Sequence, residues 1–417
     1  MTGNEPLITN DAIVLGILVL VLAAVFVTSS SNRPLFVKFY KYVPSILICY
    51  FVPGLLASVG LISADHSKIY FVTSRYLLPA CLVLLTLSID LQGVLRLGPK
   101  MLIMFFTGTA GIIIGGPAAI LIISAVDPTI VGGAGPDAVW RGLTTVAGSW
   151  IGGGANQVAM KEVFGVGDRI FGTLVAVDIL VGSLWMAVLL IAAGYSERID
   201  RANGADSSDI ERLRKKIEDY KAGIDRLPTT ADTMAVLAVG FGVTAAAHLG
   251  ADILSPWIET NWPGLAKFSL TSPFFWIVVI ATTGGLLLSF TRARRLEGVG
   301  ASRIGTVFLY LLVAAIGMKM DLHSVIDSPG LYLIGLVWIS IHALLLIVVA
   351  RLIRAPVFFL AVASQANVGG AASAPIVASA FHPSLAPVGV LIAVLGYALG
   401  TYGAWICGQV MRIVAPM

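Results

Sequence analysis

Ten runs of apolar residues, most of them about as long as a membrane-crossing helix, constrain this chain more than any other feature. An α-helix needs roughly 20 apolar residues to cross the hydrocarbon core of a bilayer. Since 57% of the 417 residues are hydrophobic and 12% are charged, the chain has more apolar surface than one soluble core could cover. The sequence therefore predicts an all-α polytopic membrane protein. The runs are 12–28, 43–62, 76–90, 101–126, 170–194, 232–249, 273–290, 304–320, 331–350 and 387–411.

The cysteines and the net charge exclude several other classes of protein. Cys49, Cys81 and Cys407 lie inside apolar runs, where a thiol behaves as a small hydrophobe, so we expect neither disulfides nor a metal framework. The net charge of +4 would suggest an anionic partner in a soluble protein. Here most Lys and Arg residues lie in loops and set topology, so we expect no nucleic-acid partner.

Two further segments, 140–164 and 356–380, are long enough to cross a bilayer but are interrupted by glycines and amides. Each comes after four apolar runs and is followed by one more, so the two segments have equivalent places in the chain. The sequence predicts a first repeat at 1–194 and a second at 231–417. The charged stretch 195–230, which contains "ERLRKKIEDYKAGIDRL", is expected to be a cytoplasmic linker helix without a site of its own.

Topology depends on whether the interrupted segments cross the membrane or return as hairpins. If they cross, each half has six crossings and the halves run parallel. If they return, each half has five crossings and the second repeat is inverted. The tail before the first run has no Lys or Arg, whereas Arg33, Lys38 and Lys41 follow it, which favours an outside N-terminus. From that start only the hairpins place most of the 27 Lys and Arg residues inside, with both termini outside.

The interruptions themselves indicate a binding site. Non-helical backbone persists at membrane depth only against protein or a water-filled cavity, because an unpaired amide in hydrocarbon costs several kcal/mol. Two Gly-interrupted segments at corresponding positions are typical of a transporter site, where helix N-termini suit a carboxylate and free carbonyls suit a cation. The alternative is that the glycines only allow close helix packing. The predicted solute-binding residues are Ser149, Gly153, Gly154, Asn156, Gln365, Asn367, Gly369, Gly370 and Ser373.

Asp178 lies eight residues into an apolar run, roughly 12 Å deep at about 1.5 Å per residue. A carboxylate at that depth marks an ion or proton pathway by default. Burial disfavours its charged form and a bound cation favours it, so both coupling ions remain open; the alternative is a structural carboxylate bonded to a neighbouring helix. The predicted ion-coupling residues are Asp178, Asn156 and Asn367, and Ser149 completes a possible sodium site.

Other charged residues near the ends of segments have ordinary explanations. Asp90 and Asp321 each end the third run of a half, where an interfacial aspartate is common. Lys161 and Glu162 close the first interrupted segment, and we expect them to pair with each other. The histidines show no metal-binding spacing.

The stretches "GSWIGGGANQVAMKEVFG", "GMKMDL" and "SQANVGGAASAP", together with Asp178 and the "LWM" that follows it, resemble the membrane family called domain of unknown function 819. The similarity covers nearly the whole chain. More remotely, the plan resembles bile acid/sodium, glutamate/sodium and 2-hydroxycarboxylate/sodium symporters. That resemblance implies a homodimer with a scaffold, a mobile core carrying both broken elements, and elevator-like alternating access. The Asn-containing tips depart from the substrate motifs of those symporters, and bile acid symporters have crossed helices that span.

These features favour a secondary active transporter for a small organic anion or an amino-acid-like solute, coupled to sodium. The alternatives are a proton-coupled transporter, a passive channel and, from another class, an intramembrane enzyme. The sequence contains no HExxH, no nucleophile with an evident base and no ATP-binding loop. We expect no cofactor other than the coupling ion, with the solute and membrane lipid as partners and the inner (plasma) membrane as location.

Overall fold

The computed structural model describes residues 6–43, 45–205, 228–319, 328–382 and 385–416. These residues are almost entirely helical and contain no strand. The elements in order are α1 (Asp11–Ser29), α2 (Pro34–Tyr42), α3 (Ser45–Ser58), α4 (Ile69–Val72), η1 (Thr73–Leu77), α5 (Leu78–Leu87), α6 (Leu91–Arg96), α7 (Pro99–Val126), η2 (Pro128–Ile130), η3 (Gly135–Asp137), α8 (Val139–Val163), α9 (Asp168–Gly194), α10 (Ser196–Asn203), α12 (Thr230–Asn261), η4 (Pro263–Phe268), α13 (Pro273–Ser289), η5 (Arg292–Val299), α14 (Ala301–Gly317), α16 (Pro329–Leu352), α17 (Val357–Val368), α18 (Gly370–Phe381) and α19 (Ala386–Val414).

Each of the ten apolar runs falls on a helix. Among the described residues, seven helices are long and apolar enough to cross a membrane, and nine spans result if each of two bent helix pairs is counted as one span. The run 304–320 corresponds to α14, a shorter apolar helix of 17 residues. The chain is therefore an all-helical multi-pass membrane protein, as the sequence predicts.

Local signals in the sequence set where several of these helices begin. Proline occupies the first turn of α7, α13 and α16, where its missing N–H is not needed. The Asn10 side chain accepts the Ala12 N–H at the start of α1. Thr229 and Asp232 form a capping box at the start of α12. These caps satisfy amide groups that the first turn of a helix leaves unpaired.

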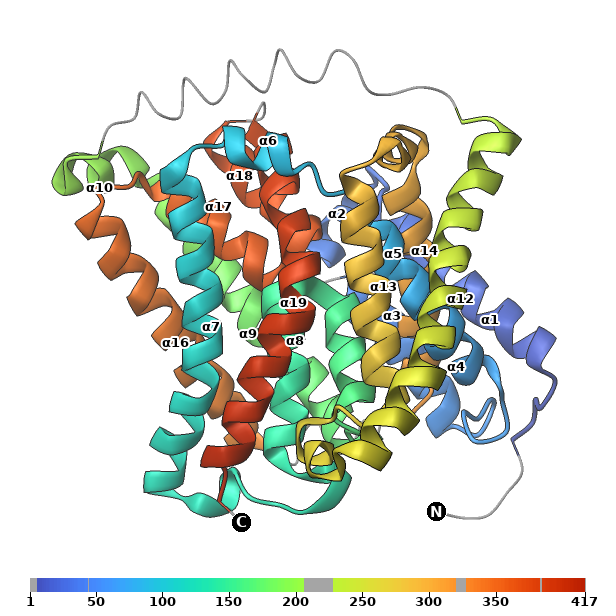
Figure 1. The fold of residues 1–417 in the computed structure, drawn as a ribbon. Helices are drawn as coiled ribbons and strands as arrows, with labels where there is room; N and C mark the ends of the chain where they lie inside the picture. Colours follow the sequence, from blue (N-terminus) through green and yellow to red (C-terminus); the bar gives the residue numbers. More distant parts are fainter. Residues whose placement is uncertain (1–5, 44, 206–227, 320–327, 383–384, 417) are drawn as a thin grey trace.

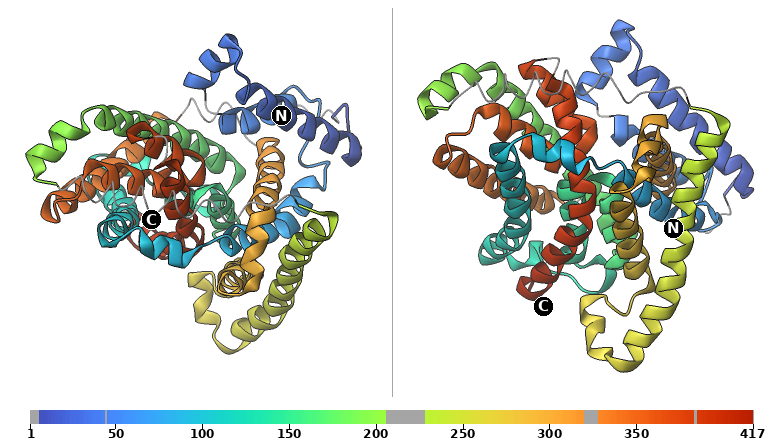
Figure 2. Two further views of the ribbon diagram at one scale, coloured as in Figure 1. Left: turned by 90° about the horizontal axis from the view of Figure 1, so that it is seen from above. Right: turned by 45° about the horizontal axis from the view of Figure 1, so that its top comes forward.

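The helices form two bundles that lie side by side (Figures 1 and 2). The first bundle contains α1, α3, α5, α12, α13 and α14, and the second contains α7, α8, α9, α16, α17, α18 and α19. Both halves of the sequence therefore contribute to both bundles, and both interrupted segments belong to the second. The repeat boundaries at 194 and 231 stay predictions.

Glycines allow α8 and α19 to pack closely inside the second bundle. A Cβ atom on Gly152 would lie 2.6 Å from the Gly396 carbonyl oxygen and 2.7 Å from the Gly400 Cα atom. Only hydrogen atoms fit at such a contact, so the two helices meet backbone to backbone. This contact fixes the first interrupted segment against the helix that ends the chain.

The part of the linker that is described packs against the second bundle. The Asp200 side chain on α10 accepts the Val357 N–H at 2.8 Å, at the first residue of α17. Asn203 donates to the Ala350 and Ala355 carbonyls at 3.3 and 3.2 Å. Residues 206–227 of the predicted linker, and Asp321, lie outside the described residues.

Candidate functional site

The first interrupted segment is a hairpin that turns at Gly153. This glycine has φ 74° and ψ −177° inside α8, a backbone conformation that L-residues with side chains rarely adopt. The two arms lie against each other, because a Cβ atom on Gly148 would be 2.5 Å from the Asn156 carbonyl oxygen. At the open end the Arg141 guanidinium donates to the Phe164 carbonyl. The segment therefore returns to the end at which it starts.

The second interrupted segment is also a hairpin, made of α17 and α18. It turns at Gly369 and Gly370, and Gly370 has φ 61°. The Gln365 side chain donates to the Ser373 hydroxyl at 2.8 Å across the turn. At the open end the rings of Phe358 and Phe381 pack edge to face, with centroids 5.3 Å apart.

The tips of the two hairpins meet inside the second bundle. A Cβ atom on Gly370 would lie 3.9 Å from the Gly153 Cα atom. Figure 1 shows α17 and α18 at the same end as α6 and α10, whereas α8 reaches the middle from the other end. The two glycine turns therefore face each other at mid-height, which is the arrangement expected for a transporter site.

An asparagine near each tip is held by the same set of hydrogen bonds. Asn156 donates to the Gly152 and Tyr397 carbonyls, both at 3.0 Å, and accepts the Thr401 hydroxyl at 2.7 Å. In the second hairpin, Asn367 donates to the carbonyls of Ala363 and Phe105, at 3.0 and 3.1 Å, and accepts the Thr109 hydroxyl at 2.8 Å. In both cases one carbonyl lies four residues earlier in the hairpin, and the other lies four residues before the threonine on a neighbouring helix.

Asp178 lies beside the first hairpin and accepts three neutral hydrogen bonds. Its Oδ2 atom accepts the Ser149 hydroxyl at 2.7 Å and the Gln157 amide at 2.8 Å, and its Oδ1 atom accepts the Trp150 indole N–H at 2.7 Å. No Lys or Arg is bonded to it in the part of the chain that the structure describes. A carboxylate offers about four acceptor positions, so one remains for a small cation.

The structure brings together only part of the predicted sodium site. Ser149 contacts Asp178, but the side chains of Asn156 and Asn367 are bonded to α19 and α7 instead. Their role in an ion site therefore stays a prediction. The hydrogen bonds that Trp150 and Gln157 donate to Asp178 were not predicted. A buried tryptophan needs an acceptor for its N–H, and that requirement is the signal that points to Trp150.

The remaining predicted residues lie around the second tip and on the far side of the first. The side-chain amide oxygen of Gln365 is buried and has no hydrogen-bond partner among the described residues. Its amide group and Ser373 crowd Gly369, where a Cβ atom would be 2.2 Å from the amide nitrogen. Gly154 instead has room for a side chain, with Leu309 of α14 at 3.8 Å from the Cβ position.

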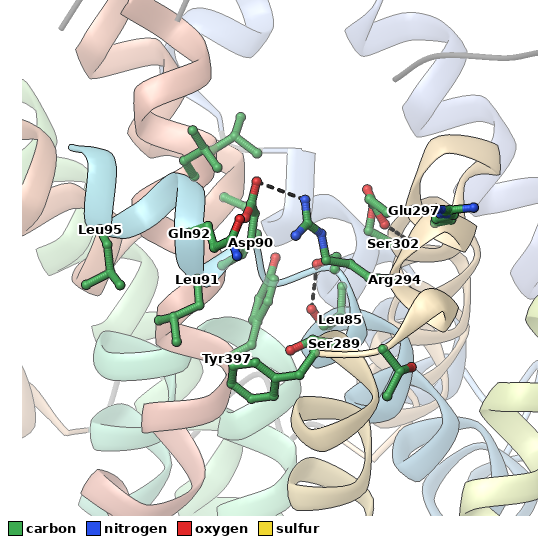
Figure 3. A pocket seen from close by; sticks show the side chains of 18 of the residues that line it. Leu85, Asp90, Leu91, Gln92, Leu95, Ser289, Arg294, Glu297, Ser302 and Tyr397 are labelled. Atoms are coloured by element: carbon green, nitrogen blue, oxygen red, sulfur yellow. Dashed lines mark hydrogen bonds and ion pairs between the residues drawn. The ribbon is translucent and has the colours of Figure 1, made fainter. Parts of the chain in front are cut away.

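A cavity of about 920 Å³ lies between the two bundles, at the end that carries α6 (Figure 3). Its walls come from the end of α5, α6 and α19 and from the region between α13 and α14, and Ala371 near the second tip also lines it. Tyr397 connects it to the first tip, because its ring lies 3.7 Å from the Cβ position of Gly153. The Tyr397 hydroxyl points toward an ion pair between Asp90 and Arg294, which are 2.9 Å apart.

Away from this cavity, a group that we call the ionic cluster joins the two bundles. Lys161 pairs with Asp168 at 2.7 Å, and Arg75 pairs with Glu162 at 2.9 Å. Lys161 and Glu162 therefore do not pair with each other as expected, because each has an oppositely charged partner on another element. The cluster consists of Tyr70, Arg75, Lys161, Glu162, Asp168 and Lys319.

No group of three or more His, Cys, Asp or Glu side chains suited to a metal ion occurs among the described residues. The three cysteines are buried and free, as their apolar surroundings predict. The site therefore offers neutral oxygen and nitrogen groups, backbone at two glycine turns and one buried carboxylate. Such a set can bind a small cation and a polar solute, and it contains no evident redox centre.

Known proteins support this membrane assignment. The chain is similar to the uncharacterised membrane protein YjcL of Bacillus subtilis (strain 168), with 23% identity over 369 residues that cover 83% of this chain and 84% of that protein. Residues 16–414 match the family described as Protein of unknown function (DUF819). Because the match extends over nearly all of the chain, including both hairpins and Asp178, this protein belongs to the DUF819 family.

Proposed function

We propose that this protein is a secondary active transporter that moves a small organic anion or an amino-acid-like solute by elevator-type alternating access, coupled to sodium. The observation that carries the proposal is the meeting of two hairpins whose glycine turns face each other beside a cavity. Backbone that is not helical at this depth needs protein or water around it, and the cavity has room for water. Paired broken elements of this kind hold solute and coupling ion in known transporter folds.

The division into bundles supports the elevator part of the proposal. Both hairpins and Asp178 belong to the second bundle, so one rigid unit would move both tips and the ion together. The first bundle would be the scaffold and would also form the interface of a homodimer. In this structure the cavity is at the α6 end, and the ionic cluster joins the bundles elsewhere. An alternating-access cycle requires such an asymmetry, because only one side opens at a time.

Asp178 supports sodium as the coupling ion. Sodium prefers hard oxygen ligands, and the carboxylate with the Ser149 hydroxyl supplies them. The three donors around Asp178 are neutral, so they stabilise its charge without cancelling it. A bound cation would complete this site, whereas a proton would replace part of its hydrogen bonding.

The orientation follows from the positive-inside rule, with the α10 end in the cytoplasm of a cell whose inner membrane holds the protein. The cavity would then be open to the cytoplasm. A non-enzymatic role agrees with the setting of the one buried serine–histidine pair that we identify among the described residues, Ser364 and His342 at 2.8 Å. Both are fully buried and neither lines the cavity, and Ser364 also accepts the Trp185 N–H.

Reconstitution tests the proposal. A thermal-shift screen of organic anions and amino acids, with and without sodium, should find a solute whose stabilisation of the purified protein depends on sodium. That solute should then accumulate in proteoliposomes under an imposed sodium gradient. Uptake that follows a pH gradient and is unchanged in potassium or choline would make the protein proton-coupled. Flux that only equilibrates the solute, whatever the gradient, would make it a channel.

A further inference from the structure

The cavity between the bundles has a mixed charge rather than a basic one. Asp90, Arg294, Arg295 and Glu297 line it, so its formal charges cancel. The Glu297 carboxylate is bonded to the backbone N–H and the hydroxyl of Ser302 at the start of α14, at 3.0 and 2.6 Å. Asp90 and Arg294 form an ion pair at the cavity wall (Figure 3).

Asp90 and Arg294 come from different parts of the molecule and differ in exposure. Asp90 connects α5 of the first bundle to α6, and one of its oxygens caps α6 by accepting the Gly93 N–H at 2.9 Å. Its other oxygen is 2.9 Å from Arg294 Nη2, on η5 after α13. The Asp90 side chain is 8% exposed, whereas that of Arg294 is 33% exposed. Because Asp90 is more buried than Arg294, leaving its charge without a partner costs more than leaving that of Arg294.

This pair discriminates between solutes by charge. A plain carboxylate that bound Arg294 would take the guanidinium from Asp90 and bring a second negative charge beside it. A plain amine that bound Asp90 would do the reverse to Arg294. A zwitterion that enters between the two gives Asp90 an ammonium group and Arg294 a carboxylate, so both charges stay paired.

The rest of the lining indicates what kind of side chain the zwitterion carries. Leu85, Leu91 and Leu95 lie on the walls around the pair, and further apolar residues of α19 also line the cavity. The Tyr397 hydroxyl is a polar group at the floor, and Ala371 marks the N-terminal turn of α18. A volume of about 920 Å³ is within the usual range for a small-molecule site.

We propose that the cavity binds a zwitterionic amino acid with an apolar side chain, with its ammonium group on Asp90 and its carboxylate on Arg294. This inference rests on the proposed transport function and selects one of its two solute classes. When the cavity is empty, Asp90 and Arg294 pair with each other, and this pair separates to admit the zwitterion. Asp90 and Arg294 belong to segments on either side of the cavity. A bound zwitterion therefore also links those two segments.

Binding by charge-edited probes tests the inference on the purified full-length protein. The probes are alanine, valine, leucine and phenylalanine, each compared with the carboxylate that lacks its amino group and the amine that lacks its carboxyl group. Leucine, for example, is matched by 4-methylpentanoate and 3-methylbutylamine. At least one amino acid should bind with a Kd about tenfold or more below those of both analogues. The inference is overturned if no amino acid binds, or if an analogue binds as tightly as its parent.

Asp90→Asn separates charge from structure, because asparagine also caps helices well. The variant should fold, lose affinity for the zwitterion by about tenfold and bind the matched carboxylate more tightly than the wild type does. Glu297→Gln is the control, since it removes an acidic charge from the same cavity without touching the pair. Equal selectivity in the wild type and Asp90→Asn would remove Asp90 from the site.

Uptake distinguishes this inference from the transport proposal. If the probe pattern holds but proteoliposomes show no gradient-driven uptake of the amino acid, the binding site stands and the transport function fails. If gradient-driven uptake is found only for solutes without an ammonium group, transport stands and the zwitterion site fails. Where the probe pattern holds, Arg294→Gln should abolish zwitterion binding.

Discussion

The hairpin of α8 and the hairpin of α17 and α18 hold their asparagines in the same way but differ in what lies beside them. Asn156 and Asn367 each satisfy two carbonyls and one threonine hydroxyl. The first hairpin has a buried carboxylate, Asp178, bonded to residues near its tip, whereas the carboxylate bonded to the second hairpin, Asp200, lies at its open end. The second has instead an unpaired buried amide oxygen, on Gln365. The comparison suggests that the asparagines maintain the hairpins and that the unmatched groups provide the function.

The largest effect is expected from removal of the Asp178 carboxylate, the group that distinguishes the tip of the first hairpin from that of the second. Asp178→Asn keeps the size of the side chain but removes the negative charge from the proposed ion site. We expect the sodium-dependent rise in melting temperature to vanish and sodium-driven uptake to fall by about 100-fold or more, at the upper end of the effects seen for metal-site neighbours.

The readout is the difference in melting temperature with and without sodium, which a general loss of stability would not abolish. Asp127→Asn, the same substitution in a loop, should leave that difference unchanged. A sodium response retained in Asp178→Asn would mean that the two hairpins do not differ in ion binding.

Removal of either asparagine should destabilise the protein to a similar extent. Asn156→Ala and Asn367→Ala each remove three buried hydrogen bonds, to two carbonyls and one threonine hydroxyl, so we expect a loss of about 2–4 kcal/mol in the free energy of unfolding for each. Unfolding in denaturant measures the loss. Transport that disappears while stability is unchanged would show instead that the asparagines contact the solute, as the sequence predicts.

The two glycine turns should also respond alike. Gly153→Ala and Gly370→Ala force a side chain into the left-handed region, at φ 74° and 61°, with an expected cost of about 1–2 kcal/mol each. Gly154→Ala is the matched control, since its Cβ position has ordinary contacts and the change should stay within about 0.5 kcal/mol. If Gly154→Ala lowered the free energy of unfolding as much as Gly153→Ala does, the left-handed backbone at Gly153 would not be the cause of the loss.

The smallest expected effect tests whether the hydrogen bonds of Asn156 and those of Asn367 are equivalent. Thr401→Val and Thr109→Val each remove one hydroxyl donor to an asparagine oxygen, for which we expect about 1 kcal/mol. Thr244→Val is the control, because the Thr244 hydroxyl bonds only to the Gly240 carbonyl of its own helix. A clear difference in the loss of stability between Thr401→Val and Thr109→Val would show that the two asparagines are not held equivalently.

Part of the candidate site follows from the sequence. Polar residues inside apolar runs are costly and therefore conspicuous, which is why Asp178, Ser149 and both glycine turns can be found without a structure. The pairing of Ser149 with Asp178 was also expected. The partners of Asn156 and Asn367 could not be expected, because an amide surrounded by helices finds its acceptors on whichever helix packs against it.

The pairings of charged residues show the same limit. Lys161 and Glu162 are neighbours in the chain, yet Lys161 pairs with Asp168 and Glu162 pairs with Arg75 on a different element. Asp90 looks ordinary in the sequence, at the end of an apolar run, and only its contact with Arg294 gives it a place in a cavity. Glu162 and Arg75, and likewise Asp90 and Arg294, lie far apart in the chain, so sequence spacing carries no information about these pairs.

The sequence by itself determined the membrane class, the ten apolar helices, the two interruptions and the deep carboxylate, because each depends on the transfer of particular residues from water to hydrocarbon. Only the tertiary structure decided that the interruptions are hairpins whose tips meet, that Asn156 and Asn367 are bound to α19 and α7, and that a cavity with an ion pair lies between two bundles. The physical reason is that hydrophobicity is a property of each segment, whereas hydrogen bonds, ion pairs and cavities depend on which segments pack together.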